Sequence, residues 1–136
     1  MSEPDIQDKI RDYIDRLTVQ FEIIGDNIWL LHCHQRGLPH VVLFAESGLV
    51  TIRAKVMEIP GNDREGFFED LLRLNIEMTH GAYALEENAV IWVDTLEFAT
   101  MDFEEFQASL DAAALSVAQH YPRLVKYRDG GAHGTI

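Results

Sequence analysis

The chain has 136 residues, of which 47% are hydrophobic and 25% are charged. This length and balance predict one globular domain and exclude wholesale disorder. The formal net charge of -12 would repel both phosphate backbones and anionic lipid headgroups. We therefore expect neither nucleic acid nor a membrane surface as a partner.

Cys33 is the single cysteine of the sequence, so an intramolecular disulfide is impossible and a reducing compartment is expected. The first ten residues, MSEPDIQDKI, lack a basic segment followed by an apolar core, so they do not predict a signal peptide. No apolar run approaches the length that crosses a bilayer. Together these features predict a soluble cytoplasmic protein.

The first predicted element is an amphipathic helix, because five apolar residues recur at helical spacing and share one face. These residues are Ile6, Ile10, Tyr13, Ile14 and Leu17. From residue 20 the apolar period changes to two, and turn residues at 25–27 predict a hairpin over 20–33. Two further strands, 41–45 and 49–59, follow the hairpin.

The second helix is predicted over residues 64–79, with Asp63 as its N-cap. Its apolar residues cover an arc of about 200°, which is more than one core can bury. The arc leaves Leu72 and Ile76 on a flank that would be exposed in a monomer. Exposed apolar area of this kind indicates an interface, so we expect these two residues at a dimer contact. The alternative is that a neighbouring loop covers the flank.

Gly81 is expected to end the second helix, since glycine accepts the left-handed conformation that closes a last turn. Alternating apolar residues over 83–93 then predict a hairpin. Asp102 and Glu105 form a capping box that starts a third amphipathic helix, interrupted near Pro122. Strands joined by short turns, with helices segregated from them, predict an α+β fold with an antiparallel sheet.

The predicted order is α-β-β-β(-β)-α-β-β-α, in a single domain over residues 1–126 with a flexible C-terminal tail over 127–136. Three segments carry a family resemblance: LLRLN in the second helix, the hairpin GAYALEENAVIWVD, and the last helix MDFEEFQASLDAAALSVAQHYPRL. Asn75 and the Tyr121-Pro122 pair belong to this pattern. From Ile6 to Leu124 the chain resembles the YbjN and Tir-chaperone group, which has the bacterial type III secretion chaperone-like fold.

The resemblance implies a small, acidic, cytoplasmic homodimer that binds a polypeptide and carries out no catalysis. It implies a YbjN-like regulator or a secretion-chaperone-like protein, with no cofactor and no catalytic residue. In the secretion chaperones of this fold, apolar patches on helices and sheet hold an extended segment of the partner. We expect Ile23, Trp29 and Leu31 to contact such a partner, an unidentified protein or peptide, through an apolar groove or an unpaired sheet edge.

An alternative function is a metal- or small-molecule-binding regulator that uses His32, His34 and His40. His32 and His34 lie two apart in a predicted strand, so both point to one face, and His40 could approach from the next strand. Three converging imidazoles would suit zinc or nickel, whereas polar surface is the expected role. Cys33 between them would face away and is expected to be a buried small hydrophobe. No constellation of residues indicates an enzyme.

Overall fold

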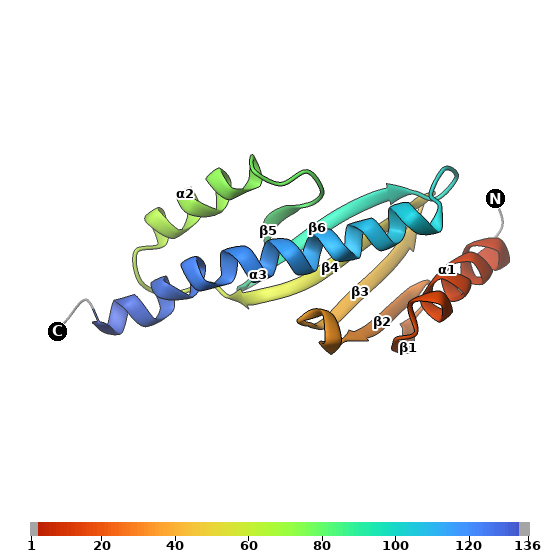
Figure 1. Ribbon diagram of the computed structural model, residues 1–136, viewed down its shortest axis with the longest axis horizontal. Coiled ribbons are helices and arrows are strands. Elements are labelled where there is room, and N and C mark those ends of the chain that lie inside the picture. The colour runs from red at the N-terminus through yellow and green to blue at the C-terminus, as the bar shows by residue number, and fades with distance from the viewer. Residues whose placement is uncertain (1–2, 134–136) are drawn as a thin grey trace.

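The computed structural model describes residues 3–133, which form one six-stranded antiparallel sheet with three α-helices and a short 3-10 helix (Figure 1). The elements are α1 (Glu3–Leu17), β1 (Gln20–Gly25), β2 (Ile28–Cys33), η1 (His34–Arg36), β3 (Leu38–Glu46), β4 (Leu49–Glu58), α2 (Arg64–Asn75), β5 (Ala82–Glu86), β6 (Ala89–Glu97) and α3 (Phe103–His133). The strand order is β1-β2-β3-β4-β6-β5. The predicted α+β class and antiparallel sheet are confirmed.

Tight turns join the paired strands because their residues adopt positive φ. Asn27 (φ 56°) closes the β1–β2 hairpin, Ser47 (φ 53°) lies between β3 and β4, and Glu87 (φ 53°) closes the β5–β6 hairpin. In the last turn Glu87 takes the left-handed conformation, and the following Asn88 does not. β4 pairs with β6, so β5 lies at an edge of the sheet and α2 belongs to the connection between β4 and β5.

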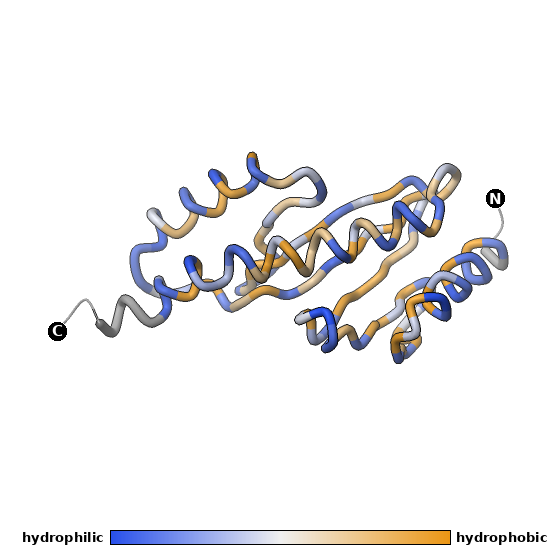
Figure 2. Tube along the Cα trace, in the orientation of Figure 1, coloured by the Kyte–Doolittle hydropathy of each residue, from blue (hydrophilic) through white to orange (hydrophobic). Residues whose placement is uncertain are grey.

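The helices pack on one face of the sheet, with α3 running across it and α1 beside its β1 end (Figure 1). Strand alternation directs Leu31, Leu43 and Ile52 to this face, where each is completely buried. Phe44 and Val42 point to the opposite face and are only half-buried, although β3 lies inside the sheet. Figure 2 shows that hydrophobic residues dominate the inner strands and alternate with polar residues along the helices. The core therefore lies in a single layer between the helices and the sheet.

α2 ends at Asn75, earlier than the predicted end near residue 79. The Asn75 side chain explains the early end, because its Oδ1 accepts a hydrogen bond from the Tyr83 backbone N–H at 2.7 Å. Its Nδ2 donates to the Tyr83 carbonyl at 3.2 Å. Gly81 (φ 74°) follows in the loop, where a Cβ would lie 2.2 Å from the Trp92 ring. This glycine is needed for close packing on Trp92 and does not end the helix.

α3 continues through Pro122, where the sequence predicted an interruption. Proline removes one backbone donor and crowds the preceding turn, but packing beyond it holds the helix. Leu124 is completely buried, and the Tyr127 ring contacts that of Phe67 edge-on with centroids 5.2 Å apart. Residues 127–133 therefore belong to α3, within the segment predicted as a tail over 127–136. The last part of that prediction, 134–136, lies outside the described residues.

Asp70 of α2 links the second helix to the third. Arg123 and the Tyr127 hydroxyl both donate hydrogen bonds to its carboxylate. These two bonds hold the pKa of Asp70 below its usual value of 3.8, and the bond from Arg123 has the larger effect. The same carboxylate raises the pKa of Tyr127 to about 12. A carboxyl whose pKa is lower in the folded state stabilises the fold above its ordinary pKa, and this stabilisation is lost as pH falls through the folded value.

Replacing Asp70 by Asn should therefore destabilise the protein at pH 7 and not below the folded pKa of Asp70. We expect a loss of about 1 kcal/mol in the free energy of unfolding at pH 7, because two hydrogen bonds to a partly exposed charge are weakened. Urea unfolding at pH 7 and at a pH well below 3.8, low enough to protonate Asp70 in the folded protein, measures both values. Glu69→Gln is the matched control. Glu69 lies on the same helix, but it is exposed, and its Oε2 is 3.6 Å from Nε of Arg73, which is a weak surface ion pair. An equal loss at both pH values would contradict this account.

Candidate binding surfaces and the histidine cluster

The three residues predicted to contact a partner do not lie in equivalent positions. Ile23 is 67% exposed on β1, whereas Trp29 is 3% and Leu31 0% exposed in the core. All three side chains point to the helix-covered face, since Ile23 pairs with Trp29 and the alternation of β2 places Leu31 on the same side. The helices bury β2 there but leave the outer strand uncovered. Trp29 and Leu31 therefore belong to the core, and only Ile23 is available at the surface.

β1 forms one edge of the sheet, and β5 forms the other. β1 itself carries two large exposed apolar side chains, Ile23 at 67% and Ile24 at 52% exposure. An edge strand presents backbone N–H and C=O groups that no neighbouring strand pairs. With apolar side chains beside those groups, this edge has the features that accept an added strand.

Leu72 and Ile76 are among the most exposed apolar side chains of the described chain, at 71% and 89%. No loop in the described residues covers them, so this alternative from the sequence analysis does not hold. Leu72 lies on α2 as predicted, but Ile76 follows the helix in the loop that leads to β5. Leu115 of α3 is also 59% exposed, although the sequence analysis did not select it. Its position outside the buried apolar stripe of the helix was the signal for it.

Two hollows flank α3, and no sequence pattern indicated either of them. A groove of about 370 Å³ separates α3 from the loop after α2, and Leu115 and Met78 help to line it. A larger groove of about 590 Å³ lies between α3 and the ends of β3 and β4. Most of its lining is apolar and includes Leu38, Pro39, Val56, Val117, Tyr121 and Pro122. Both grooves arise from helix-to-sheet packing, which a sequence pattern does not determine.

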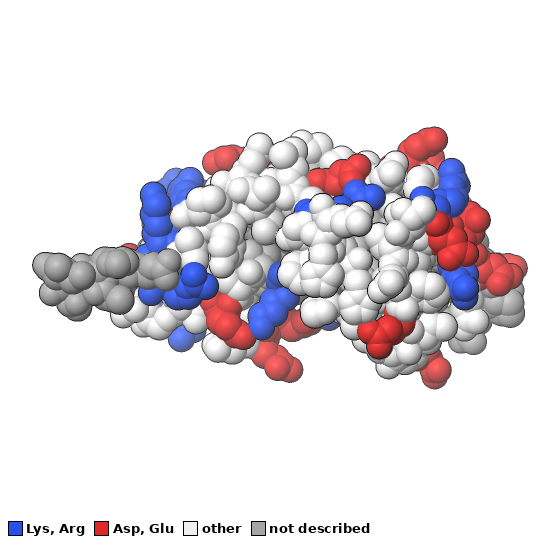
Figure 3. Space-filling view, turned by 60° about the horizontal axis from the view of Figure 1, so that its bottom comes forward, with Lys and Arg blue, Asp and Glu red and all other residues white. Residues whose placement is uncertain are grey.

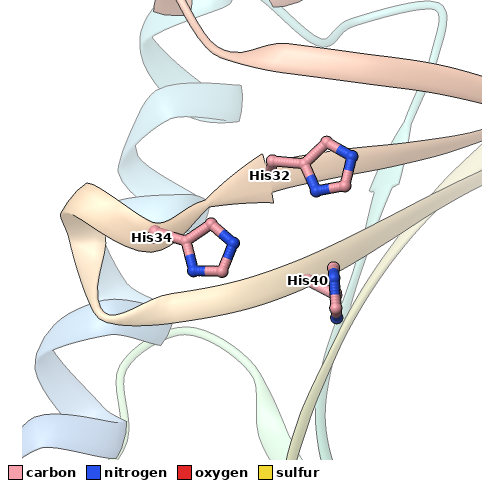
Figure 4. Close-up of side chains that lie close together, drawn as sticks. All are labelled: His32, His34 and His40. Atoms are coloured by element: carbon pink, nitrogen blue, oxygen red, sulfur yellow. The ribbon is translucent and has the colours of Figure 1, made fainter.

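His32, His34 and His40 lie together at the end of the β2–β3 hairpin (Figure 4). One ligand atom of each ring lies within 4.8 Å of those of the other two. The ring centroids of His32 and His40 are 5.5 Å apart, and those of His34 and His40 are 6.0 Å apart. Leu31 pairs with Val41, so the antiparallel register brings His32 and His40 opposite each other. The structure therefore brings the three histidines together, although His34 lies in η1 and not in the strand that the sequence predicted for it.

Glu22 of β1 is the one acidic side chain in hydrogen-bonding contact with this cluster among the described residues. Its Oε2 lies 2.8 Å from Nε2 of His32. No sequence pattern indicated Glu22, because its approach to His32 depends on the β1–β2 register. Cys33 points to the opposite, buried face and is 1% exposed. Burial raises the pKa of the Cys33 thiol, so it stays protonated and inaccessible, as expected of a buried small hydrophobe.

A histidine outside this cluster, His120, forms a buried polar contact in the core. Nδ1 of His120 on α3 lies 2.7 Å from the hydroxyl of Tyr83 on β5. Burial lowers the pKa of His120, and burial raises the pKa of Tyr83. Both groups therefore stay neutral near pH 7, and their hydrogen bond fixes the edge strand β5 to α3. We assign this pair a role in holding the fold together.

Charge is unevenly distributed over the surface. Figure 3 shows Lys and Arg gathered beside the C-terminal end of α3, and a mixed group of acidic and basic side chains at the opposite end of the molecule. The area between them is mostly uncharged in this view. Among the described residues, no helix has the length and apolar character needed to span a bilayer. The uncharged middle is the part of this side that is best suited to contact with an apolar surface.

Comparison with known proteins places this architecture among related folds. The CesT_Tir_1 family model matches residues 3–129, and no curated protein matches the sequence. YbjN from E. coli is similar in structure, with a TM-score of 0.68 at 14% identity over 90% of this chain and 95% of that chain.

Two further structures are complexes. A chain of the heterodimeric ExoU–SpcU complex from the type III secretion system of Pseudomonas aeruginosa has a TM-score of 0.68 at 14% identity. The match covers 87% of this chain and 96% of that one. A chain of the HopA1–SchA chaperone–effector complex has a TM-score of 0.62 at 11% identity, over 95% of this chain and 97% of that one. These likenesses establish a shared fold.

Proposed function

Because the chain belongs to the CesT_Tir_1 family, we propose that it is a non-enzymatic, chaperone-like protein of the cytoplasm that binds a partner polypeptide. The observation that carries this proposal is the exposed apolar edge of β1, with Ile23 at 67% and Ile24 at 52% exposure. Two structural neighbours come from complexes, one heterodimeric and one between a chaperone and an effector. The single, buried Cys33 fits a reducing compartment.

The partner segment would bind in extended form along β1. Its backbone would pair with the free N–H and C=O groups of this strand, which contributes affinity without requiring a particular sequence. Its apolar side chains would lie against Ile23 and Ile24. The larger groove beside α3, which Val117 and Tyr121 help to line, offers a second apolar contact for a longer segment.

We also propose a homodimer that uses Leu72 and Ile76, with Leu115 as an additional contact. Leu115 lines the groove between α3 and residues 77–80, and Ile76 directly precedes this loop. These three side chains are 71%, 89% and 59% exposed. Burying each of them against a second copy would contribute roughly 1 to 2 kcal/mol. This surface is separate from β1, so a dimer could bind a partner at each outer edge.

The dimer can be tested by light scattering, which should give a mass twice the 15.5 kDa of the chain. Leu72→Asp and Ile76→Asp should each shift the protein towards the monomer, because a carboxylate buried without a partner costs several kcal/mol. Leu49→Asp is the matched control, since Leu49 is 43% exposed on β4, and it should leave the mass unchanged. A monomeric wild type, or an unchanged dimer in both test variants, would contradict the proposed interface.

Polypeptide binding can be tested by affinity capture from the native cells, followed by mass spectrometry. The wild type should enrich a discrete set of proteins, and Ile23→Lys should reduce their recovery by about tenfold or more, because a charge at the strand edge blocks pairing. Leu49→Lys should capture the same set as the wild type. The captured proteins should keep their unmodified masses if the chain does not act on them chemically.

The capture experiment has two outcomes that would overturn the proposal. One is a set of captured proteins that Ile23→Lys retains in full. The other is a covalent change in the captured proteins that depends on the chain, which would indicate an enzyme. Light scattering on Ile23→Lys separates this result from the dimer proposal, since β1 lies outside the Leu72 and Ile76 surface.

A further inference from the structure

We propose that His32, His34 and His40 bind one divalent transition-metal ion of the borderline class, with Zn²⁺ as the test ion. Glu22 would act as a positioning residue for His32. The cluster is well suited to this because three separate pieces of backbone deliver the three rings to one point. The proposed protein-binding function does not require a metal, although His40 also lines the larger groove beside α3, so the inference goes beyond that function.

The local backbone explains why the rings meet. His32 is near the end of β2, His40 is near the start of β3, and the register Leu31↔Val41 places the two histidines opposite each other. A register irregularity follows, because Cys33 pairs with Leu38. The extra length is taken up by η1, which begins at His34. Gly37 closes this turn with φ 79°, a conformation that glycine adopts without strain.

The distances are compatible with coordination after a small movement. All three ligand atoms lie within 4.8 Å of one another. Zinc–nitrogen bonds of about 2.0 to 2.1 Å in a tetrahedral site place the nitrogens about 3.3 Å apart. The rings must therefore approach one another by roughly 1.5 Å or less. His34 and His40 are exposed and His32 is half-buried, so side-chain rotation can supply this movement without a change in the backbone.

Glu22 prepares His32 for binding. With Nε2 of His32 donating to Oε2 of Glu22 at 2.8 Å, the proton resides on Nε2 and Nδ1 keeps its lone pair. Figure 4 shows a ring nitrogen of His32 directed towards the gap between the three rings. A carboxylate that accepts from the second nitrogen of a metal-bound histidine fixes the tautomer and raises the basicity of the ligand. This contact is an observation independent of the clustering itself.

The donor set selects the kind of metal. Three neutral imidazoles suit Zn²⁺, Ni²⁺ and Cu²⁺, whereas Ca²⁺ and Mg²⁺ prefer oxygen ligands. Arg36, the nearest basic residue in sequence, pairs with Asp111 at 2.5 Å, so its charge is offset. Three protein ligands leave a fourth position for water or for a side chain of a bound partner. A metal here would also tie Glu22, and with it the edge strand β1, to the β2–β3 hairpin.

The test uses the untagged full-length chain, purified without metal-affinity resin and treated with chelator. Zn²⁺ titration by calorimetry and Co²⁺ titration by visible absorbance should both show saturable binding of one ion per chain. His34→Ala and His40→Ala should each weaken Zn²⁺ binding by at least about 100-fold, since two ligands remain. Glu22→Gln should weaken it by about 10-fold to 100-fold. His80→Ala removes an exposed histidine outside the cluster and should leave binding unchanged.

Circular dichroism and thermal unfolding of each metal-free variant establish that the fold is intact. The proposal is overturned if the wild type shows no saturable binding of one ion. It is equally overturned if the His34→Ala, His40→Ala double variant retains wild-type affinity, or if His80→Ala loses as much affinity as the cluster variants. Capture of partner polypeptides by metal-free protein is measured separately, so failure of the metal site leaves the protein-binding proposal standing.

Discussion

The packing of α3 across one face of the sheet is the constraint on which the rest of the structure depends. Phe106 and Leu110 of the helix and Trp92 of the sheet are all completely buried in this layer. The Ser109 hydroxyl also donates to the Asp94 carboxylate of β6 at 2.8 Å, which fixes the helix relative to the strand. With the helices placed on one face, the outer strand β1 and parts of α2 and α3 remain apolar and uncovered.

This arrangement accounts for the separation of the proposed surfaces. Ile23 points to the same face as the buried Trp29, but the helices leave the outer strand β1 uncovered, so Ile23 stays exposed. Leu72 stays exposed because it lies on the side of α2 away from the core. The histidine cluster lies at a third position, where the β2–β3 hairpin ends. Each surface can thus be altered by substitution without removing a core side chain, which makes the roles proposed for them separable by experiment.

Much of the fold could be predicted from the sequence, because hydrophobic periods of two and 3.6 residues are set locally. Tertiary contacts decided the rest. The end of α2 depends on the Asn75 side chain bonding to Tyr83, and the course of α3 beyond Pro122 depends on packing at Leu124. Strand alternation placed His32 and His34 on one face and allowed His40 to approach, but His34 reaches the cluster from η1, which the sequence did not predict. Alternation also could not predict that Trp29 is buried while its cross-strand neighbour Ile23 is exposed, because that follows from where the helices lie.

The central claim is that the exposed edge at β1 contacts another polypeptide, and site-specific photo-crosslinking in the native cells tests it most directly. A photoreactive amino acid at Ile23 should give a discrete covalent adduct with a second protein after irradiation. The same amino acid at Glu46, which is exposed on β3, should give none. An absence of adduct at Ile23, or an equal adduct at Glu46, would contradict the account.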